Sequence, residues 1–306
     1  MELKTLALNA FAQNKRAALL IGGAGVAFLG LGLGYKYLRK PEKVVRVGVV
    51  SQLLIHPLKS GRAVSVPLAE CLQIGLKFGE LQDRHWLVVT EQGHMVTGRQ
   101  QPRLVLLSLT CEDGHVCLSG PDMEELRFPG RDCGEETSRW LIRFLGKEQT
   151  FRLVHFEPQM RGRRTEPLLP PFEVAYSDEA PVMLLSEASV QDLSSRLEED
   201  VTVKRFRPSI VISDCEAFAE DSWVDIQIGS VRLQRVKSCG RCIFTTVDPE
   251  TGVISRKEPL DTLKSYRLCK PSDQHIYQKA PLFGQLLIVK QEGTLQVGDV
   301  VYKISR

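Results

Sequence analysis

The chain has 306 residues, of which 43% are hydrophobic and 25% are charged. These values are ordinary for a globular protein and predict one large domain or two intimate ones. The net charge of +3 is unevenly placed: residues 1–46 carry eight Lys or Arg against two Glu, and the remainder carries 32 basic against 35 acidic residues. The basic excess therefore belongs to the N-terminus, and the composition gives no reason to expect a nucleic-acid-binding protein.

A charge-free stretch near the N-terminus predicts a membrane anchor. The 19 residues from Ala17 to Tyr35 lack any charge, which is close to the length that a helix needs to cross a bilayer. We therefore expect a targeting segment at 1–16, a single transmembrane helix at 17–38 and a linker at 39–50. A secretory signal peptide is the alternative, but its apolar region is usually only ~7–15 residues long. Basic residues after the apolar stretch favour a cytosolic position for the rest of the chain.

Short strands between turns dominate the chain beyond the linker. We predict them where β-branched and aromatic residues gather, namely at 44–58, 85–90, 95–99, on both sides of a turn at 112–114, and at 151–158, 182–186, 209–213, 224–236, 243–248, 252–255 and 284–304. The proline-rich segment 161–174 has no periodicity and predicts a long loop between two halves. Together these features predict an α+β fold with a β-barrel-like core.

Two helices are predicted among these strands. The first covers about 135–145, where four apolar residues form one stripe: Trp140, Leu141, Phe144 and Leu145. The second begins near residue 186, with Ser186 or Ser189 as its N-cap.

The pair Cys239 and Cys242 is the motif with the most chemistry. Zinc would need a second pair of ligands, and a dithiol redox pair would need a following helix, whereas 243–248 predicts a strand. Two hypotheses remain: both cysteines are buried structural residues, or one of them is a thiolate ligand of a soft, redox-active metal. We expect Arg241 to lower the pKa of the Cys242 thiol and to be able to bind an anion. Neither nucleotide-binding glycine motif is present.

Several separated blocks of sequence resemble one known family. They include "HPLKSG", "LQDRHWLVV", "AYSDEAP", "FRPSIVIS" and "CGRCIFTTVDPETGVISRKEPLDTLKSYR". On these blocks the chain resembles the MOSC-domain proteins that bind molybdenum cofactor, and in particular the reductases of N-hydroxylated compounds among them. The resemblance implies a MOSC-type β-barrel core with an N-terminal α/β half. We place the N-terminal region at 51–156 and the MOSC domain at 157–306.

The resemblance also implies a site. Cys242 matches the protein ligand to molybdenum, and Asp178 is a candidate proton donor. Further matches to positions that bind the cofactor, Mo-molybdopterin, are Lys59, Ser60, Arg84, Asp178, Arg207, Ser209 and Arg241. The chain departs from the pattern at Ser209, where relatives have asparagine, and at Glu179 and Ala180, where they have small hydroxyl residues. The segment 118–131 is also short against the family.

The implied reaction is the two-electron reduction of amidoximes, hydroxylamines and N-oxides to amidines or amines. The resemblance implies that electrons come from cytochrome b5 and its NADH-dependent reductase, on the mitochondrial outer membrane facing the cytosol. The alternative function is a sulfur carrier or sulfurtransferase that works through a Cys242 persulfide. A cofactor-binding module without turnover is a further alternative.

Overall fold

A computed structural model describes residues 42–129, 134–146, 149–164 and 172–305. Residues 44–305 form one compact unit. Among the described residues, no helix is long and apolar enough to cross a membrane. The predicted targeting segment 1–16 and transmembrane helix 17–38 lie outside the described residues.

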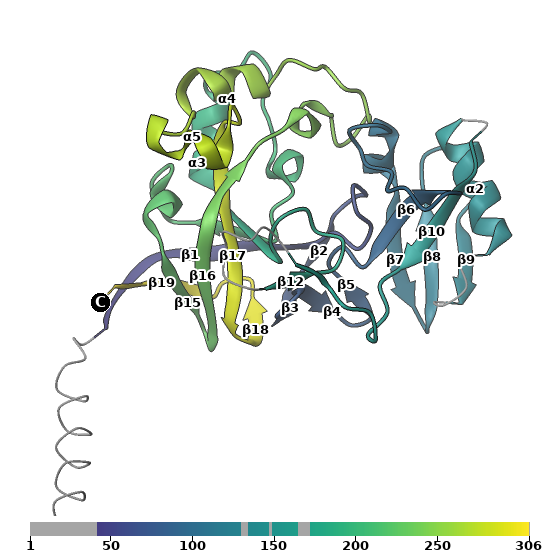
Figure 1. Cartoon of the computed structure of the whole chain (residues 1–306). Coiled ribbons are helices and arrows are strands. Elements are labelled where there is room, and N and C mark those ends of the chain that lie inside the picture. The colour runs from purple at the N-terminus through teal and green to yellow at the C-terminus, as the bar shows by residue number, and fades with distance from the viewer. Residues whose placement is uncertain (1–41, 130–133, 147–148, 165–171, 306) are drawn as a thin grey trace, which may run out of the picture. The chain divides into compact units, whose positions relative to one another are not determined.

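The largest sheet among the described residues closes into a barrel (Figure 1). Among the described strands, seven follow each other around it in the order β14-β13-β17-β16-β15-β19-β1, and β1 pairs with β14 to close it. Their bounds are β1 Lys43–Ile55, β13 Val182–Ser186, β14 Ile210–Ser213, β15 Asp225–Ile228, β16 Val231–Gly240, β17 Leu282–Gln291 and β19 Val300–Ser305. The strand β2, Val64–Val66, extends the sheet beyond β1. With its helices, this architecture confirms the predicted α+β class with a barrel core.

Smaller sheets surround the barrel. One consists of β18 Gly293–Gln296, β3 Leu68–Leu72, β4 Gly75–Phe78 and β5 Leu81–Gln82. The other sheets are β7 Ser108–Glu112 with β8 His115–Ser119 and β9 Leu126–Pro129, β6 Trp86–Thr90 with β10 Phe151–His155, and β11 Arg163–Arg164 with β12 Glu173–Val174. The two halves of the chain exchange strands, because β1 belongs to the barrel and β18 pairs with β3.

Two predicted helices are confirmed. The helix α2 spans Glu135–Leu145, packs against β10 (Figure 1), and buries the predicted stripe of Trp140, Leu141, Phe144 and Leu145. The helix α3 spans Glu187–Ser194, and Ser186 is its N-cap because its Oγ accepts a hydrogen bond from the Ser189 amide at 3.1 Å. The remaining helical segments are α4 Leu260–Tyr266, α5 Gln274–Tyr277, and the 3₁₀ turns η1 Pro102–Leu106, η2 Val203–Phe206, η3 Ala219–Ser222, η4 Ile243–Thr246 and η5 Pro271–Asp273.

The strand predicted at 243–248 is wrong. The segment after Cys242 is the 3₁₀ turn η4. Thr245 Oγ1 donates to the Cys242 carbonyl at 2.9 Å and Thr246 Oγ1 donates to the Ile243 carbonyl at 2.8 Å. These threonine side chains bond their own backbone and so compete with a strand ladder. The strand predicted before the turn at 112–114 is β7, and the residues that precede it form the 3₁₀ turn η1, because Pro102 favours a helical start there.

Candidate functional site

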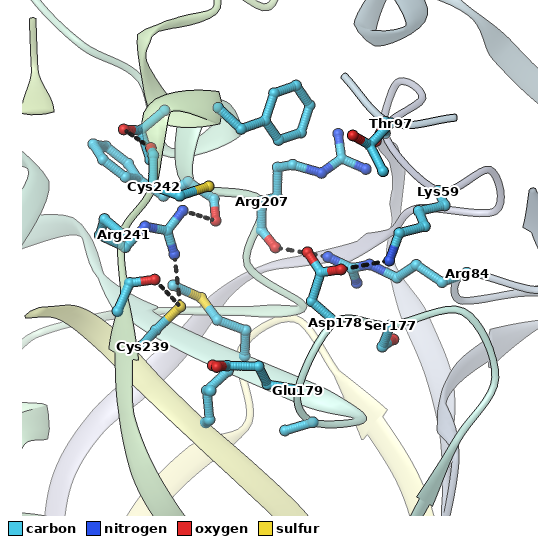
Figure 2. A pocket seen from close by; sticks show the side chains of 18 of the residues that line it. Lys59, Arg84, Thr97, Ser177, Asp178, Glu179, Arg207, Cys239, Arg241 and Cys242 are labelled. Carbon is cyan, nitrogen blue, oxygen red and sulfur yellow. Dashed lines mark hydrogen bonds and ion pairs between the residues drawn. The ribbon is translucent and has the colours of Figure 1, made fainter. Parts of the chain in front are cut away.

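A cavity of about 290 Å³ opens beside the barrel (Figure 2). Its wall combines cationic side chains, three sulfur-containing residues and apolar side chains. The lining residues are Lys59, Ser60, Arg84, Thr97, Arg99, Tyr176, Ser177, Asp178, Glu179, Ala180, Met183, Arg205, Phe206, Arg207, Cys239, Gly240, Arg241, Cys242, Phe244, Thr245 and Leu286. Among them, six cationic side chains face two acidic ones, so the cavity favours an anionic ligand.

Strand register explains why distant segments meet here. Leu53 near the end of β1 pairs with Ile210 at the start of β14. Residues that follow β1 therefore lie beside residues that precede β14. The strand β13 runs parallel to β14 with Leu184 opposite Ile210, so the segment before β13 joins the same group. This register brings together Lys59, Asp178 and Arg207.

Three cavity residues have backbones in the left-handed region. The φ angle is 67° at Ser60, 52° at Arg84 and 58° at Arg207. Residues other than glycine rarely adopt this region, and such strain clusters at functional sites. Here it turns two guanidinium groups and a hydroxyl toward one cavity. Ser60 Oγ is held in place because it accepts a hydrogen bond from the Gly98 amide at 2.9 Å.

Arg207 carries an unsatisfied donor. Its Nη1 donates to the Gly61 carbonyl at 2.6 Å, but its buried Nη2 has no hydrogen-bond partner in the part of the chain that the structure describes. Burial, and next the repulsion by Arg84, lower the pKa of Arg207 to about 9. A buried unpaired donor is costly. An anion bound in the cavity would relieve this cost.

A buried acid holds Arg84 in position. Arg84 Nη1 pairs with Asp83, and Arg84 Nη2 donates to the Arg207 carbonyl at 3.1 Å. Burial opposes ionisation of Asp83, but Arg84 and His56 outweigh it and lower its pKa to about 2. Burial, followed by repulsion from Arg84 and Arg207, lowers the pKa of His56 to about 3. His56 is therefore neutral and Asp83 ionised at neutral pH.

Asp178 connects two cations. Lys59 Nζ donates to Asp178 Oδ1 at 2.6 Å (Figure 2) and to the Tyr176 carbonyl at 2.6 Å. On the other side, Arg99 Nη1 lies 3.6 Å from Asp178 Oδ2. Partial desolvation raises the pKa of Asp178, but Lys59 and then Arg99 outweigh it and lower the pKa below its usual value. Burial also lowers the pKa of Lys59. The Asp178 carboxyl is thus ionised at neutral pH, which does not suit the predicted role of proton donor.

The two cysteines of the C-x-x-C motif differ in their surroundings. Cys242 is exposed and is a free thiol, and the Arg99 Nη1 atom lies 3.8 Å from its Sγ. Arg241 Nη1 instead contacts Cys239 Sγ at 2.9 Å, and its Nη2 donates to the Phe206 carbonyl at 2.8 Å (Figure 2). Arg241 was expected to act on the Cys242 thiol, but its guanidinium contacts the other cysteine of the motif, and Arg99 contacts Cys242. Within the described ranges, no group of three or more His, Cys, Asp and Glu side chains could hold a metal ion.

The three departures from the family pattern have different consequences. Ser209 is fully buried and does not line the cavity, because it lies behind Met183, whose amide donates to the Ser209 Oγ at 3.3 Å. Glu179 lines the cavity, and Lys237 Nζ pairs with its Oε1 at 2.8 Å, which compensates the added negative charge. Ala180 lines the cavity without a polar group.

Sequence reasoning missed several lining residues. Arg99 and Arg205 bring two further positive charges, and Phe244 supplies an aromatic wall. Arg205 Nη2 pairs with Asp248 at 3.0 Å, and its buried Nε has no partner among the described residues. Locally, each of these arginines resembles a solvated surface cation, so the sequence offered no signal beyond charge.

Comparison with known proteins identifies the class. Residues 171–302 match the MOSC domain family, and residues 47–148 match the family described as the MOSC N-terminal beta barrel domain. The chain is therefore a MOSC-domain protein, in agreement with its barrel.

Full-length relatives narrow this class. The chain is 58% identical to "Mitochondrial amidoxime-reducing component 1" of Danio rerio over 100% of both chains. It is 49% identical to the Homo sapiens protein of that name, over 88% of this chain and 86% of the relative. It is 44% identical to "Mitochondrial amidoxime reducing component 2" of Homo sapiens, over 93% and 92%. The chain belongs to the family of mitochondrial amidoxime-reducing components.

Proposed function

We propose that this chain is a molybdenum-cofactor-dependent reductase that converts amidoximes, hydroxylamines and N-oxides to amidines or amines. The observation that carries the proposal is the cavity in which the free Cys242 thiol shares a wall with Arg207, whose buried Nη2 lacks a partner. A soft thiolate suits molybdenum, and unpaired guanidinium groups suit the phosphate and the polar ring system of the cofactor.

The residues that would hold the cofactor fit its chemistry. Cys242 would supply the one protein ligand to the metal. Lys59, Arg84, Arg207 and Arg241 would bind phosphate and carbonyl groups, with Ser60 and Ser177 as smaller polar contacts. When bound, the cofactor would supply the two-electron redox chemistry that breaking the N–O bond requires. Ser209 has no part in this set, because it lies outside the cavity.

The side chains around the cavity handle protons. Reduction of one N–O bond to an amine and water consumes two electrons and two protons. The ionised Asp178 cannot give the first proton, whereas the ammonium group of Lys59, whose pKa is lowered by burial, can. Asp178 is 58% exposed and bonded to Lys59, so it is placed to return a proton from solvent. Asp178 then serves as a relay and as an anchor for Lys59.

Electrons require a partner protein. We propose cytochrome b5 and its NADH-dependent reductase as the source, on the outer mitochondrial membrane. In this proposal residues 1–16 target the chain and residues 17–38 anchor it. The predicted linker 39–50 is too long, because residues 43–50 belong to the barrel strand β1 and therefore to the catalytic unit, together with regions 51–156 and 157–306. A shared membrane surface raises the effective concentration of such partners.

The test combines metal analysis with turnover. Full-length protein in detergent should carry about one molybdenum per chain, since one thiolate holds one metal ion, and should reduce benzamidoxime with NADH, cytochrome b5 and its reductase. Cys242→Ser should lose both metal and turnover, whereas Cys269→Ser, which lies outside the cavity, should keep both. A metal-free protein with labile sulfur on Cys242 would support the persulfide alternative and refute the reductase.

A further inference from the structure

Arg99 lies on a turn that the N-terminal half of the chain presents to the cavity. The turn follows β6 and is closed by bonds within itself: the Thr97 amide donates to Gln100 Oε1 at 2.9 Å, and the Gln100 amide donates to the Thr97 carbonyl at 2.9 Å. The Gly98 amide donates to Ser60 Oγ, also at 2.9 Å. The backbone that carries Arg99 is thus fixed to another segment of the cavity wall.

The same turn packs directly on the segment that carries Cys242. A methyl group at Gly98 would lie 2.5 Å from Cζ and 2.9 Å from Cδ2 of Phe244. The Phe244 ring therefore occupies the space that a side chain at position 98 would need. Because Phe244 is two residues beyond Cys242, this contact sets the position of η4 relative to Arg99.

The side chain of Arg99 completes the bridge. It makes the contacts to Cys242 Sγ at 3.8 Å and to Asp178 Oδ2 at 3.6 Å described above. Asp178 also pairs with Lys59 (Figure 2), so the guanidinium of Arg99 is held from one side by an anchored carboxylate. A cation beside a sulfur ligand stabilises its negative charge, orients it, and raises the reduction potential of a metal bound to it.

We propose that Arg99 is a positioning residue that holds the Cys242 sulfur toward the cavity and withdraws charge from it. The consequence for the metal rests on the proposed function, whereas the consequence for the thiol does not. Arg99 contacts the thiol, which distinguishes it from the cationic residues that line the cavity around the expected cofactor.

The first experiment uses cofactor-free, full-length protein. Alkylation of Cys242 by iodoacetamide is followed at pH 7.5 by peptide mass spectrometry in wild type, Arg99→Gln, Arg99→Lys and Arg103→Gln. Arg103 is the matched control, because it belongs to the next turn and lies over the Phe144 ring rather than in the cavity. We expect Arg99→Gln to slow alkylation severalfold, Arg99→Lys to restore part of the rate, and Arg103→Gln to match wild type. Equal rates in all four proteins would overturn the proposal.

The second experiment uses cofactor-loaded protein. Arg99→Gln should lower the midpoint potential of the bound molybdenum in a redox titration and reduce kcat for benzamidoxime about tenfold, with KM nearly unchanged. An unchanged potential would overturn the role at the metal. If wild type instead held no molybdenum and reduced no amidoxime, the proposed function would fail, and the alkylation rates would still decide whether Arg99 acts on the thiol.

Discussion

The substitution Gly98→Ala tests the packing between the turn that carries Arg99 and the Phe244 ring near Cys242. The added methyl group would overlap the Phe244 ring at distances that side-chain contacts do not reach. Either the ring or the turn must move, and overpacking of this kind costs about 1–3 kcal/mol. For a unit of this size, such a loss lowers the Tm by about 2–12 °C. Because Phe244 follows Cys242 closely, we also expect lower molybdenum content in the folded variant.

A double-mutant cycle separates this clash from a general loss of stability. Phe244→Leu removes the ring atoms that the methyl group would meet, so Gly98→Ala combined with Phe244→Leu should be less destabilised than the sum of the two single variants. Thermal unfolding of the full chain in detergent gives the three values, and a coupling of about 0.5–3 kcal/mol is expected for residues in contact. Additive losses, or a Gly98→Ala variant as stable as wild type, would refute the packing argument.

Three further predictions concern charges in and behind the cavity. Glu179→Ala should lower the free energy of unfolding, measured in urea, by about 1–2 kcal/mol, because it leaves the Lys237 side chain, which is 8% exposed, without its partner. The loss should be smaller than for a fully buried pair, since Glu179 itself is 39% exposed. Adding Lys237→Met should recover the loss, and a persistent loss would contradict this account. The free energy of unfolding should fall as the pH drops from 6.5 toward 3, because the unfolded chain protonates His56 while the folded ring, with a pKa of about 3, does not. Asp83, with a folded pKa of about 2, adds its loss only below pH 3.8. His56→Gln should therefore flatten the slope between pH 6.5 and 3.8, and an unchanged slope in the variant would contradict the assignment. Inorganic phosphate should raise the Tm of cofactor-free wild type by binding the cations of the cavity, and Arg207→Gln should reduce the shift; an equal shift in both proteins would show that phosphate binds elsewhere.

Local patterns predicted the seven barrel strands and the helices α2 and α3, but they missed β2 to β5 and the closure of the barrel. The stripe of α2 follows from helical spacing, and the N-cap at Ser186 follows from side-chain chemistry within four residues. Closure instead depends on Val49 pairing with Ser213, a contact between strands far apart in the chain. No local rule encodes such a partner, so the sequence could predict strands without their order.

The segment after Cys242 shows where local reasoning failed. Its apolar and β-branched residues favour a strand by propensity. In the structure, the hydroxyls of Thr245 and Thr246 bond backbone carbonyls three residues earlier, and the chain turns as η4. This turn leaves Cys242 exposed at the cavity, whereas a continued ladder would have alternated the side chains across a sheet.

Some site residues could be matched through the family resemblance, whereas others could be found only from their contacts in the structure. Lys59, Arg84 and Arg207 stand in sequence blocks with distinctive neighbours, so they could be matched without coordinates. Arg99 depends on a contact across 143 positions to Cys242. Ser209 matched by position but does not line the cavity, and its hydroxyl accepts a hydrogen bond from the Met183 amide. Charge and motif therefore locate a segment at the site, while side-chain direction decides which residues act there.

The division of the site between the two halves has a mechanistic consequence. The thiol lies between the end of β16 at Gly240 and the turn η4, whereas Lys59 and Arg99 come from segments of the N-terminal half. Neither half can hold an anionic metal cofactor alone, because one lacks the sulfur and the other lacks part of the cationic wall. The exchanged strands β1 and β18 keep these halves in register. The pairing of β1 with β14 that closes the barrel therefore also places Lys59 beside Arg207, and so joins the cations of the two halves.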